Sequence, residues 1–264
     1  MREQILNRID ELTKENVFVA FSGGADSGLL LKLCACAAAK NNTRVYAVML
    51  HTKLHPMEDI EVAGRVAEEI GAELIVLHID ELEETGIENN PKNRCYLCKK
   101  GLFLKMQAEA ERRGITTIIE GTNGDDLHAY RPGIQALKEL GIVSPLAEFK
   151  VSKKEVREWL ADLGVSVSDR PSSPCLATRL PYGDAINYDL LSRIDEGETF
   201  LRSLGFYNVR LRVHGNIIRI EVDKSDIPKL LDCSESVITK LKELRFVYIT
   251  IDMEGFRSGS MDID

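Results

Sequence analysis

Short apolar runs alternate with amphipathic stretches over the first part of the chain. An apolar run of about four to eight residues is typical of a buried strand. Four such runs occur, at residues 17–21, 44–50, 73–79 and 116–120. The stretches around them repeat apolar residues at helical spacing and predict helices at residues 1–14, 27–40, 56–70, 95–113 and 152–163. Because strands that alternate with such helices need crossover connections, the sequence predicts an α/β fold with a doubly wound parallel sheet.

The pattern changes after about residue 165. Residues 166–186 carry three prolines and no periodicity. The elements predicted beyond them are a helix at 188–204, a hairpin centred on His214-Gly215-Asn216, a helix at 234–244 and a strand at 246–252. We therefore predict two domains, the α/β domain over residues 1–184 and a smaller α+β domain over residues 185–264.

Composition and charge exclude several classes of protein. Hydrophobic residues make up 44% of the 264 residues and charged residues 29%, which is the balance of a folded chain and not of a disordered one. The formal net charge of −8 argues against a broad cationic surface for RNA or DNA. No apolar run reaches the ~18 residues that cross a bilayer, and the start of the chain lacks the apolar stretch of a signal peptide. We expect a cytoplasmic protein with no nucleic-acid or membrane partner.

The string SGGADS, at residues 22–27, joins the first predicted strand to a helix. Gly23 and Gly24 allow the backbone to approach an anion, and the helix N-terminus behind them adds a positive partial charge. Ser22 and Ser27 offer hydroxyl donors. Asp26 would repel a bare phosphate, so its presence indicates that Mg²⁺ bridges it to the phosphates of a nucleotide. The string is not a Walker A loop, and the alternative is a plain strand-to-helix turn.

A second polar string, EGTNGDD at residues 120–126, follows the fourth predicted strand. Ligands of parallel sheets bind at the carboxyl ends of the strands, so this string belongs to the same edge of the sheet as SGGADS. We expect Gly121 and Thr122 to line the nucleotide and Asp125 to add a carboxylate near Mg²⁺. The alternative is a turn rich in Asn and Asp.

The chain has six cysteines, and disulfides are rare in the reducing cytoplasm. Cys95 and Cys98 form a CxxC pair at the start of a predicted helix, and Cys175 lies in the irregular stretch. The pair could be a redox dithiol, or part of a zinc site whose fourth ligand is His128 or a remote cysteine. Three thiolates can instead hold a 4Fe–4S cluster with one iron open to an exogenous sulfide. The remaining cysteines are interpreted as buried packing residues or residues without a chemical role: Cys34, Cys36 and Cys233.

SGGADS resembles the PP-loop of the ATP pyrophosphatase superfamily, whose members split ATP between its α and β phosphates and attach AMP to an oxygen of the substrate. Together with CYLCKK, EGTNGDD, RPG, SPLAEFKVSKKEVR, PSSPCLATRLPYG, RVHG and EGFRSGSM, it resembles the LarE family from about residue 15 onward. The resemblance implies a PP-loop domain followed by a small C-terminal domain. It also implies ATP-dependent sulfur transfer to pyridinium-3,5-biscarboxylic acid mononucleotide, whose thiocarboxylate product is the organic part of the nickel-pincer cofactor of lactate racemase.

The family has two ways to supply the sulfur. In one, the cysteine that matches Cys175 gives up its own sulfur and becomes dehydroalanine. In the other, a CxxC pair joins that cysteine in holding a 4Fe–4S cluster, which relays sulfur from sulfide or another donor. Because Cys95 and Cys98 are present, we favour the cluster, with Cys175 as both ligand and catalytic residue. Under the sacrificial alternative, Cys95 and Cys98 are structural or bind zinc.

The implied substrate is anionic, so its site needs cations. Arg210 and Arg212 alternate on a predicted strand, which places both guanidinium groups on one face, and the resemblance puts them near the substrate or its phosphate. Arg179 is expected to orient the acyl phosphate or the cluster loop. Glu198, on the helix before the hairpin, is expected to order these arginines. For each of these residues the alternative is a solvated charged face.

Three other functions compete with sulfur transfer to a small molecule. A tRNA thiolase of the same superfamily also pairs a PP-loop with three cysteines, but the net charge of −8 counts against it. An amidating synthetase needs an ammonia source, and the sequence has no visible glutaminase half. A nucleotide-binding regulator could use the same loop without catalysis. We expect a small nucleotide substrate, a sulfur donor and assembly into a homo-oligomer.

Overall fold

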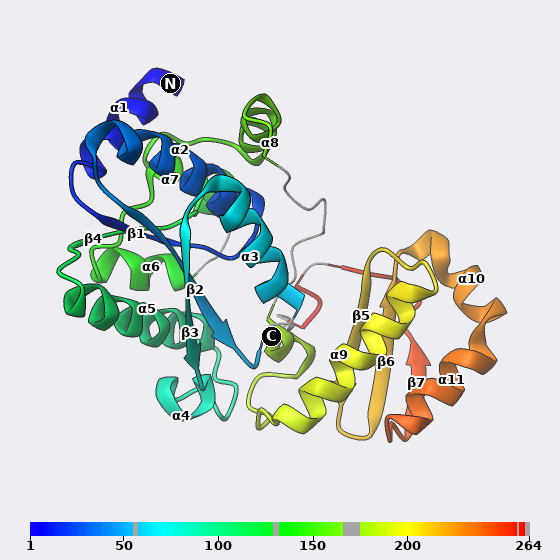
Figure 1. Cartoon of the computed structure of the whole chain (residues 1–264). Helices are drawn as coiled ribbons and strands as arrows, with labels where there is room; N and C mark the ends of the chain where they lie inside the picture. The colour runs from blue at the N-terminus through cyan, green and yellow to red at the C-terminus, as the bar shows by residue number, and fades with distance from the viewer. Residues whose placement is uncertain (55–57, 129–131, 166–174, 258, 262–264) are drawn as a thin grey trace. The chain divides into compact units, whose positions relative to one another are not determined.

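The computed structural model describes residues 1–54, 58–128, 132–165, 175–257 and 259–261 (Figure 1). The chain divides into two compact units. The first comprises residues 1–86 and 93–172, and the second comprises residues 87–92 and 173–264. The first part of the predicted irregular stretch, residues 166–174, lies outside the described residues.

A four-stranded parallel sheet forms the centre of the first unit. Its strands are β1 (Val17–Ala20), β2 (Val45–Thr52), β3 (Glu73–Ile79) and β4 (Thr117–Ile119), in the order β3-β2-β1-β4. All three pairings are parallel. Because β1 and β4 are neighbours that run in the same direction, the loops that follow them lie at the same edge of the sheet.

Helices cover both faces of this sheet (Figure 1). They are α1 (Arg2–Leu12), α2 (Ala25–Asn41), α3 (Glu58–Ile70), α4 (Glu81–Thr85), α5 (Arg94–Arg112), α6 (Pro132–Glu139), α7 (Pro145–Glu148) and α8 (Lys153–Asp162), with a 3-10 turn, η1, at Asp125–His128. Val17 and Val19 of β1 pack in one apolar cluster with α1, α2, α3 and α8. Phe18, which points the other way, packs in a second cluster with α5 and α6. This arrangement confirms the predicted doubly wound α/β fold.

The long predicted helices agree with the structure to within about two residues at each end. The sequence did not predict α4, α6 or α7, because helices of four to eight residues are too short for their periodicity to stand out. No helix in the described part of the chain is both long and apolar enough to cross a membrane.

The second unit contains a three-stranded sheet in the order β5-β6-β7. Its elements are η2 (Leu176–Arg179), α9 (Tyr188–Ser203), β5 (Val209–His214), β6 (Ile217–Val222), η3 (Lys224–Asp226), α10 (Ile227–Asp232), α11 (Ser234–Glu243) and β7 (Tyr248–Ile251). The antiparallel pairing of β5 with β6 confirms the predicted hairpin, and β7 pairs parallel to β6. Gly197 of α9 lies against the side chains of Leu211 and Leu241, so the apolar face of the sheet packs on α9 and α11.

A short segment, residues 87–92, belongs to the second unit by its contacts although it lies inside the first in sequence. The side-chain amide of Asn90 donates to the carbonyl oxygens of Leu180 at 3.2 Å and Pro181 at 2.7 Å. Gly183 N donates back to Asn90 O at 3.1 Å. These bonds group residues 175–184 with the second unit, whereas the sequence-based boundary after residue 184 places them in the first domain.

Helix α8 begins with the capping box that its sequence predicts. Ser152 Oγ accepts a hydrogen bond from Glu155 N at 3.3 Å, and Glu155 Oε2 accepts one from Ser152 N at 2.8 Å. Two backbone donors that a helix start would leave unsatisfied are thereby bonded. The hydrogen bonds from Ser152 lower the pKa of Glu155.

We expect Ser152→Ala to lower the free energy of unfolding of the first unit by about 1 kcal/mol, because the substitution removes the side-chain cap. Trp159, the single tryptophan of the chain, is buried on α8, so its fluorescence during urea unfolding reports on this helix. Ser152→Thr keeps the hydroxyl and is the matched control. Equal urea midpoints for Ser152→Ala and the native protein would contradict this prediction.

The same variant has an expected pH dependence. Because the pKa of Glu155 is lowered in the folded state, its contribution to stability is complete above the pKa it has when unfolded. The contribution disappears as the pH falls through the lowered value. The difference in stability between the native protein and Ser152→Ala should therefore shrink in acid.

Candidate functional site

The loop between β1 and α2 is held closed by two serines. Ser27 Oγ lies 3.3 Å from Ser22 Oγ, accepts from Ser22 N at 3.3 Å and donates to Gly24 O at 3.2 Å. Gly23 has a φ of 73°, a conformation that favours glycine. Gly24 is the N-cap of α2, so the first-turn N–H groups and the positive end of the helix dipole follow it directly. These are the features of an anion-binding loop.

The loop after β4 lies against this helix start. A Cβ atom added at Gly121 would lie 3.0 Å from Ser27 N and 3.3 Å from the carbonyl carbon of Asp26. A side chain at this position would force the backbone of α2 away by a few tenths of an ångström, so glycine suits this approach. Asn123 Nδ2 also donates to Asp26 Oδ1 at 3.2 Å. The structure thus brings the strings SGGADS and EGTNGDD together at one edge of the sheet.

Two residues that the sequence assigns to the nucleotide are bonded within the protein. Thr122 donates to Glu120 through its N–H at 3.0 Å and through its hydroxyl at 2.9 Å. Ser144 Oγ also donates to Glu120. Asp125 Oδ2 accepts from Lys153 N at 2.8 Å, so this carboxylate anchors the start of α8. Thr122 therefore fixes its own loop, and Asp125 fixes the helix that follows it in the site.

Sequence reasoning missed Lys153, whose ammonium group forms an ion pair with Asp26 Oδ2. Lys153 occupies the first position of α8, where the helix dipole disfavours a cation. That mismatch is the signal in the sequence that points to a specific partner. The Asp26 carboxylate also has the hard oxygen ligands that Mg²⁺ prefers, so the residues present fit a magnesium ion in competition with Lys153.

Cys95 and Cys98 both lie in the first two turns of α5, and their i, i+3 spacing places them on one face. Cys95 is exposed and Cys98 is half-buried, whereas the half-buried Cys175 belongs to the second unit. Over the residues that the structure describes, no three His, Cys, Asp or Glu side chains are grouped closely enough to hold a metal ion. The CxxC thiolates fit as two ligands of a soft metal, and the three-cysteine set stays a prediction.

The packing role expected for the remaining cysteines holds in part. Cys34 is buried, and burial raises the pKa of its thiol to about 12, which keeps it protonated and unreactive. Cys36, which was expected to be buried, is exposed. The reason is geometric, since residues two apart on a helix point about 200° apart.

The polar face of the β5–β6 hairpin carries a cluster of charged side chains. Arg210 lies opposite Glu221 and Arg212 lies opposite Arg219 across the strands. The intervening Leu211 is fully buried on the apolar face. Arg210 and Arg212 therefore share one face of the sheet, as their alternation predicts.

A buried ion pair supports this cluster from outside the sheet. Arg179 donates to both oxygens of Glu198, from Nε at 2.7 Å and from Nη2 at 2.8 Å, and the two side chains are only 2% and 1% exposed. Glu198 Oε1 also accepts from Leu211 N at 2.9 Å, a backbone donor of the edge strand β5. Burial alone would raise the pKa of Glu198, but the hydrogen bonds and charge of Arg179 outweigh it, so the pKa is lowered.

Cys175 is attached to the same network through its backbone. It begins η2, and its carbonyl oxygen accepts from Thr178 Oγ1 at 2.8 Å and from Arg179 Nη1 at 3.5 Å. Arg212 Nη1 donates to Thr178 O at 2.9 Å. Cys175 is therefore bonded to Arg179 directly and to Arg212 through Thr178. Arg179 in turn is bonded to Glu198.

Among the described residues, six arginines of this cluster meet five carboxylates. Three carboxylates are each shared by two arginines: Glu198 by Arg179 and Arg202, Glu221 by Arg212 and Arg219, and Asp252 by Arg219 and Arg257. Arg202 also pairs with Asp195, and Arg257 with Glu254. Within the described residues, Arg210 forms no ion pair with a carboxylate. Burial and then the charge of Arg179 lower the pKa of Arg210 to about 10. A partly buried cation without its own counterion is suited to an anionic ligand.

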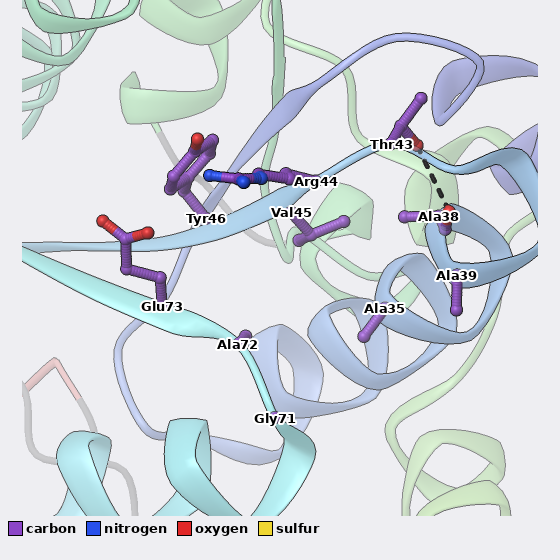
Figure 2. Close-up of a pocket in the computed structure, with 10 residues that line it drawn as sticks. All are labelled: Ala35, Ala38, Ala39, Thr43, Arg44, Val45, Tyr46, Gly71, Ala72 and Glu73. Carbon is purple, nitrogen blue, oxygen red and sulfur yellow. Dashed lines mark hydrogen bonds between the residues drawn. The ribbon is translucent and has the colours of Figure 1, made fainter.

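A separate hollow of about 310 Å³ lies in the first unit, where β2 and β3 begin (Figure 2). Its wall consists of alanines of α2 with Arg44, Tyr46 and Glu73 around them. The strands of the sheet are parallel, so this hollow is at the edge opposite the β1 and β4 loops. It contains none of the predicted site residues, and we do not assign it to the site.

Comparison with known proteins supports a PP-loop site. The family profile of the PP-loop domain matches residues 1–128. The chain is 35% identical over 248 residues to the pyridinium-3,5-bisthiocarboxylic acid mononucleotide synthase of Lactiplantibacillus plantarum, with 94% of this chain and 89% of the synthase covered. It is also 38% identical to an uncharacterised protein of Synechocystis (94% and 92% covered) and 32% identical to one of Methanocaldococcus jannaschii (96% and 95% covered).

We expect Glu198→Gln to destabilise the second unit by about 3 to 5 kcal/mol, because the amide leaves the buried Arg179 charge without its counterion. Hydrogen exchange of the Leu211 amide, which bonds to Glu198, measures the effect locally. Glu254→Gln is the matched control, since Glu254 pairs with Arg257 at an exposed site. The control should change stability by less than about 0.5 kcal/mol. Similar exchange rates in the two variants would show that the buried pair is not required.

Proposed function

The chain belongs to the LarE family, and we propose that it is an ATP-dependent sulfur transferase acting on pyridinium-3,5-biscarboxylic acid mononucleotide. The proposed enzyme transfers AMP from ATP to a carboxylate oxygen of the substrate and releases pyrophosphate. A sulfur nucleophile then forms a C–S bond as the C–O bond to AMP breaks, which gives the thiocarboxylate and AMP. The observation that carries this proposal is that a cysteine, Cys175, is held by an arginine cluster with excess positive charge.

On the ATP side, the PP-loop residues Ser22, Gly23, Gly24 and Ser27 and the start of α2 would receive the phosphates. Gly121, which lies against this helix start, would line the nucleotide from the neighbouring loop. Asp26 would hold the Mg²⁺ ion. Because Lys153 already pairs with Asp26, a magnesium ion would release its ammonium group toward the phosphate oxygens, where it would neutralise negative charge. The other two residues assigned to ATP, Thr122 and Asp125, would act by fixing the loop and α8.

On the substrate side, we assign anion binding to Arg210 first, because it lacks a carboxylate partner among the described residues. Arg212 and Arg179 are engaged with Glu221 and Glu198 and would orient the substrate through the positive charge that they add around Arg210. Glu198 fixes the geometry of this group. The name of the Lactiplantibacillus plantarum relative, a synthase of the bisthiocarboxylic acid mononucleotide, supports an anionic mononucleotide as the substrate.

For the sulfur supply, we propose that Cys95, Cys98 and Cys175 hold a 4Fe–4S cluster. A cluster bound by only three thiolates keeps one iron open to bind sulfide. The exposed Cys95 and half-buried Cys98 on one face of α5 are compatible with two of its ligands. The protein would work in the cytoplasm as a homo-oligomer, with sulfide or another small sulfur donor as its partner.

Two alternatives stay open beside this proposal. The first is sacrificial transfer of the Cys175 sulfur, in which the protein turns over once. The second is tRNA thiolation by the same chemistry, for which a gel shift with total tRNA is the direct test. Incubation with ATP and the acceptor, either the mononucleotide or tRNA, separates these enzymes from a regulator without activity, because a regulator releases no pyrophosphate or AMP with either acceptor.

We expect Cys175→Ala to reduce thiocarboxylate formation to background while pyrophosphate release persists. The substitution removes the sulfur but leaves the carbonyl that Thr178 and Arg179 bind. Mass spectrometry of the mononucleotide product and a pyrophosphate assay measure the two half-reactions. Cys233→Ala, in the same unit, is the control and should leave both unchanged. Undiminished thiolation by Cys175→Ala would refute the assigned role of this cysteine.

A second measurement separates the two sulfur sources. The native protein, purified without oxygen, should contain about four iron and four sulfide per chain and turn over repeatedly with added sulfide. Cys95→Ser should lose most of the iron, whereas Cys36→Ser should retain it. An iron-free protein that turns over once, with Cys175 converted to dehydroalanine, would establish the sacrificial reaction instead.

A further inference from the structure

The chain segment after β7, which includes the string EGFRSGSM, returns to the polar face of the small sheet. Gly255 N donates to Asp252 O at 3.1 Å, and Phe256 N donates to Val222 O, at the end of β6, at 2.7 Å. Further along, Ser260 Oγ donates to Glu221 Oε1 at 2.6 Å, a bond that is buried. Hydrogen bonds from Phe256 and Ser260 therefore attach this segment to β6 beside the arginine cluster.

Phe256 contacts Arg210, the arginine that pairs with no carboxylate among the described residues of the cluster. The guanidinium carbon of Arg210 lies over the Phe256 ring, 5.2 Å from its centroid. Arg210 Nη1 also donates to Val209 O at 2.6 Å. The ring and one carbonyl thus fix the side chain at a site where the neighbouring positive charges of Arg179 and Arg212 would push it toward solvent.

An aromatic ring holds a guanidinium group differently from a carboxylate. A carboxylate occupies the in-plane N–H donors and cancels the charge, as Glu198 does for Arg179. A ring contacts the face of the guanidinium plane and leaves most in-plane donors and the full charge available. Phe256 therefore orders Arg210 without reducing its capacity to bind an anion.

We propose that Phe256 is a positioning residue that presents Arg210 to an anionic group of the substrate, with phosphate as the chemical class that fits the guanidinium donors. The proposal deepens the function proposed above and rests on the substrate being an anion. It assigns the C-terminal string to the substrate site rather than to the end of the fold. Without the ring, Arg210 would have to be ordered when the anion binds, which costs free energy.

The test is calorimetric titration of inorganic phosphate into the full-length protein after the PP-loop has been saturated with Mg²⁺ and a non-hydrolysable ATP analogue. Arg210→Ala identifies the phosphate binding that depends on Arg210. We expect Phe256→Leu to weaken that binding about three- to tenfold, as expected for one side chain that is no longer ordered in advance. Phe256→Tyr keeps the ring and should restore it. In turnover, Phe256→Leu should raise the KM for the mononucleotide and leave kcat unchanged.

Phe246→Leu is the matched control, because Phe246 contacts Arg193 at 5.6 Å elsewhere in the same unit. It should leave phosphate affinity unchanged. Unaltered affinity in Phe256→Leu, equal weakening in Phe246→Leu, or no phosphate binding that depends on Arg210 would each overturn the positioning role. If phosphate binding follows the expected pattern but the mononucleotide is not thiolated, the positioning role stands and the proposed function fails.

Discussion

The buried pair of Arg179 and Glu198 connects three elements of the second unit, η2, α9 and β5. Removing two charges from water costs several kcal/mol for each ion, and only good hydrogen-bond geometry offsets that cost. Glu198 meets this condition with two bonds from Arg179 and one from Leu211 N. A single carboxylate thus fixes the edge strand β5 and the turn that carries Cys175. The position of the cysteine depends on this ion pair together with the buried apolar residues of the same turn, Leu176 and Ala177.

The ion pair of Asp26 and Lys153 in the first unit has a different physical character. Its side chains are 20% and 40% exposed, so water can replace either partner and the net energy of the pair is small. An exposed pair of this kind can be exchanged for a metal ion or a phosphate, whereas the Arg179–Glu198 pair cannot. The two pairs therefore differ in what they allow: the buried pair holds a fixed frame, and the more exposed pair could respond to the magnesium ion and phosphates of the proposed function.

The sequence predicts those parts of the structure that have a local signal. Alternation with period 2 places Arg210 and Arg212 on one face, and strand-to-helix junctions identify the SGGADS and EGTNGDD loops. Contacts between charges far apart in sequence have no such signal. Lys153 lies 127 residues from Asp26, and the residues around Lys153 do not indicate which carboxylate it pairs with. For the same reason the sequence did not show that residues 87–92 and 175–184 bond to one another.

The second unit holds its arginines in three ways, and these differ in what remains for a ligand. Arg179 is neutralised by a bidentate carboxylate, and Arg212 is shared between a carboxylate and the carbonyl of Thr178. Arg210 is held by an aromatic ring, and its lowered pKa of about 10 reflects a positive charge that burial destabilises. Burial lowers the pKa of Arg212 as well, but Arg212 has Glu221 beside it, whereas Arg210 has no carboxylate partner among the described residues. A bound anion would therefore relieve this destabilisation most at Arg210. Under the proposed function, Arg210 would therefore be the guanidinium group that gains most from an anionic substrate, and the other arginines would determine where that substrate can lie.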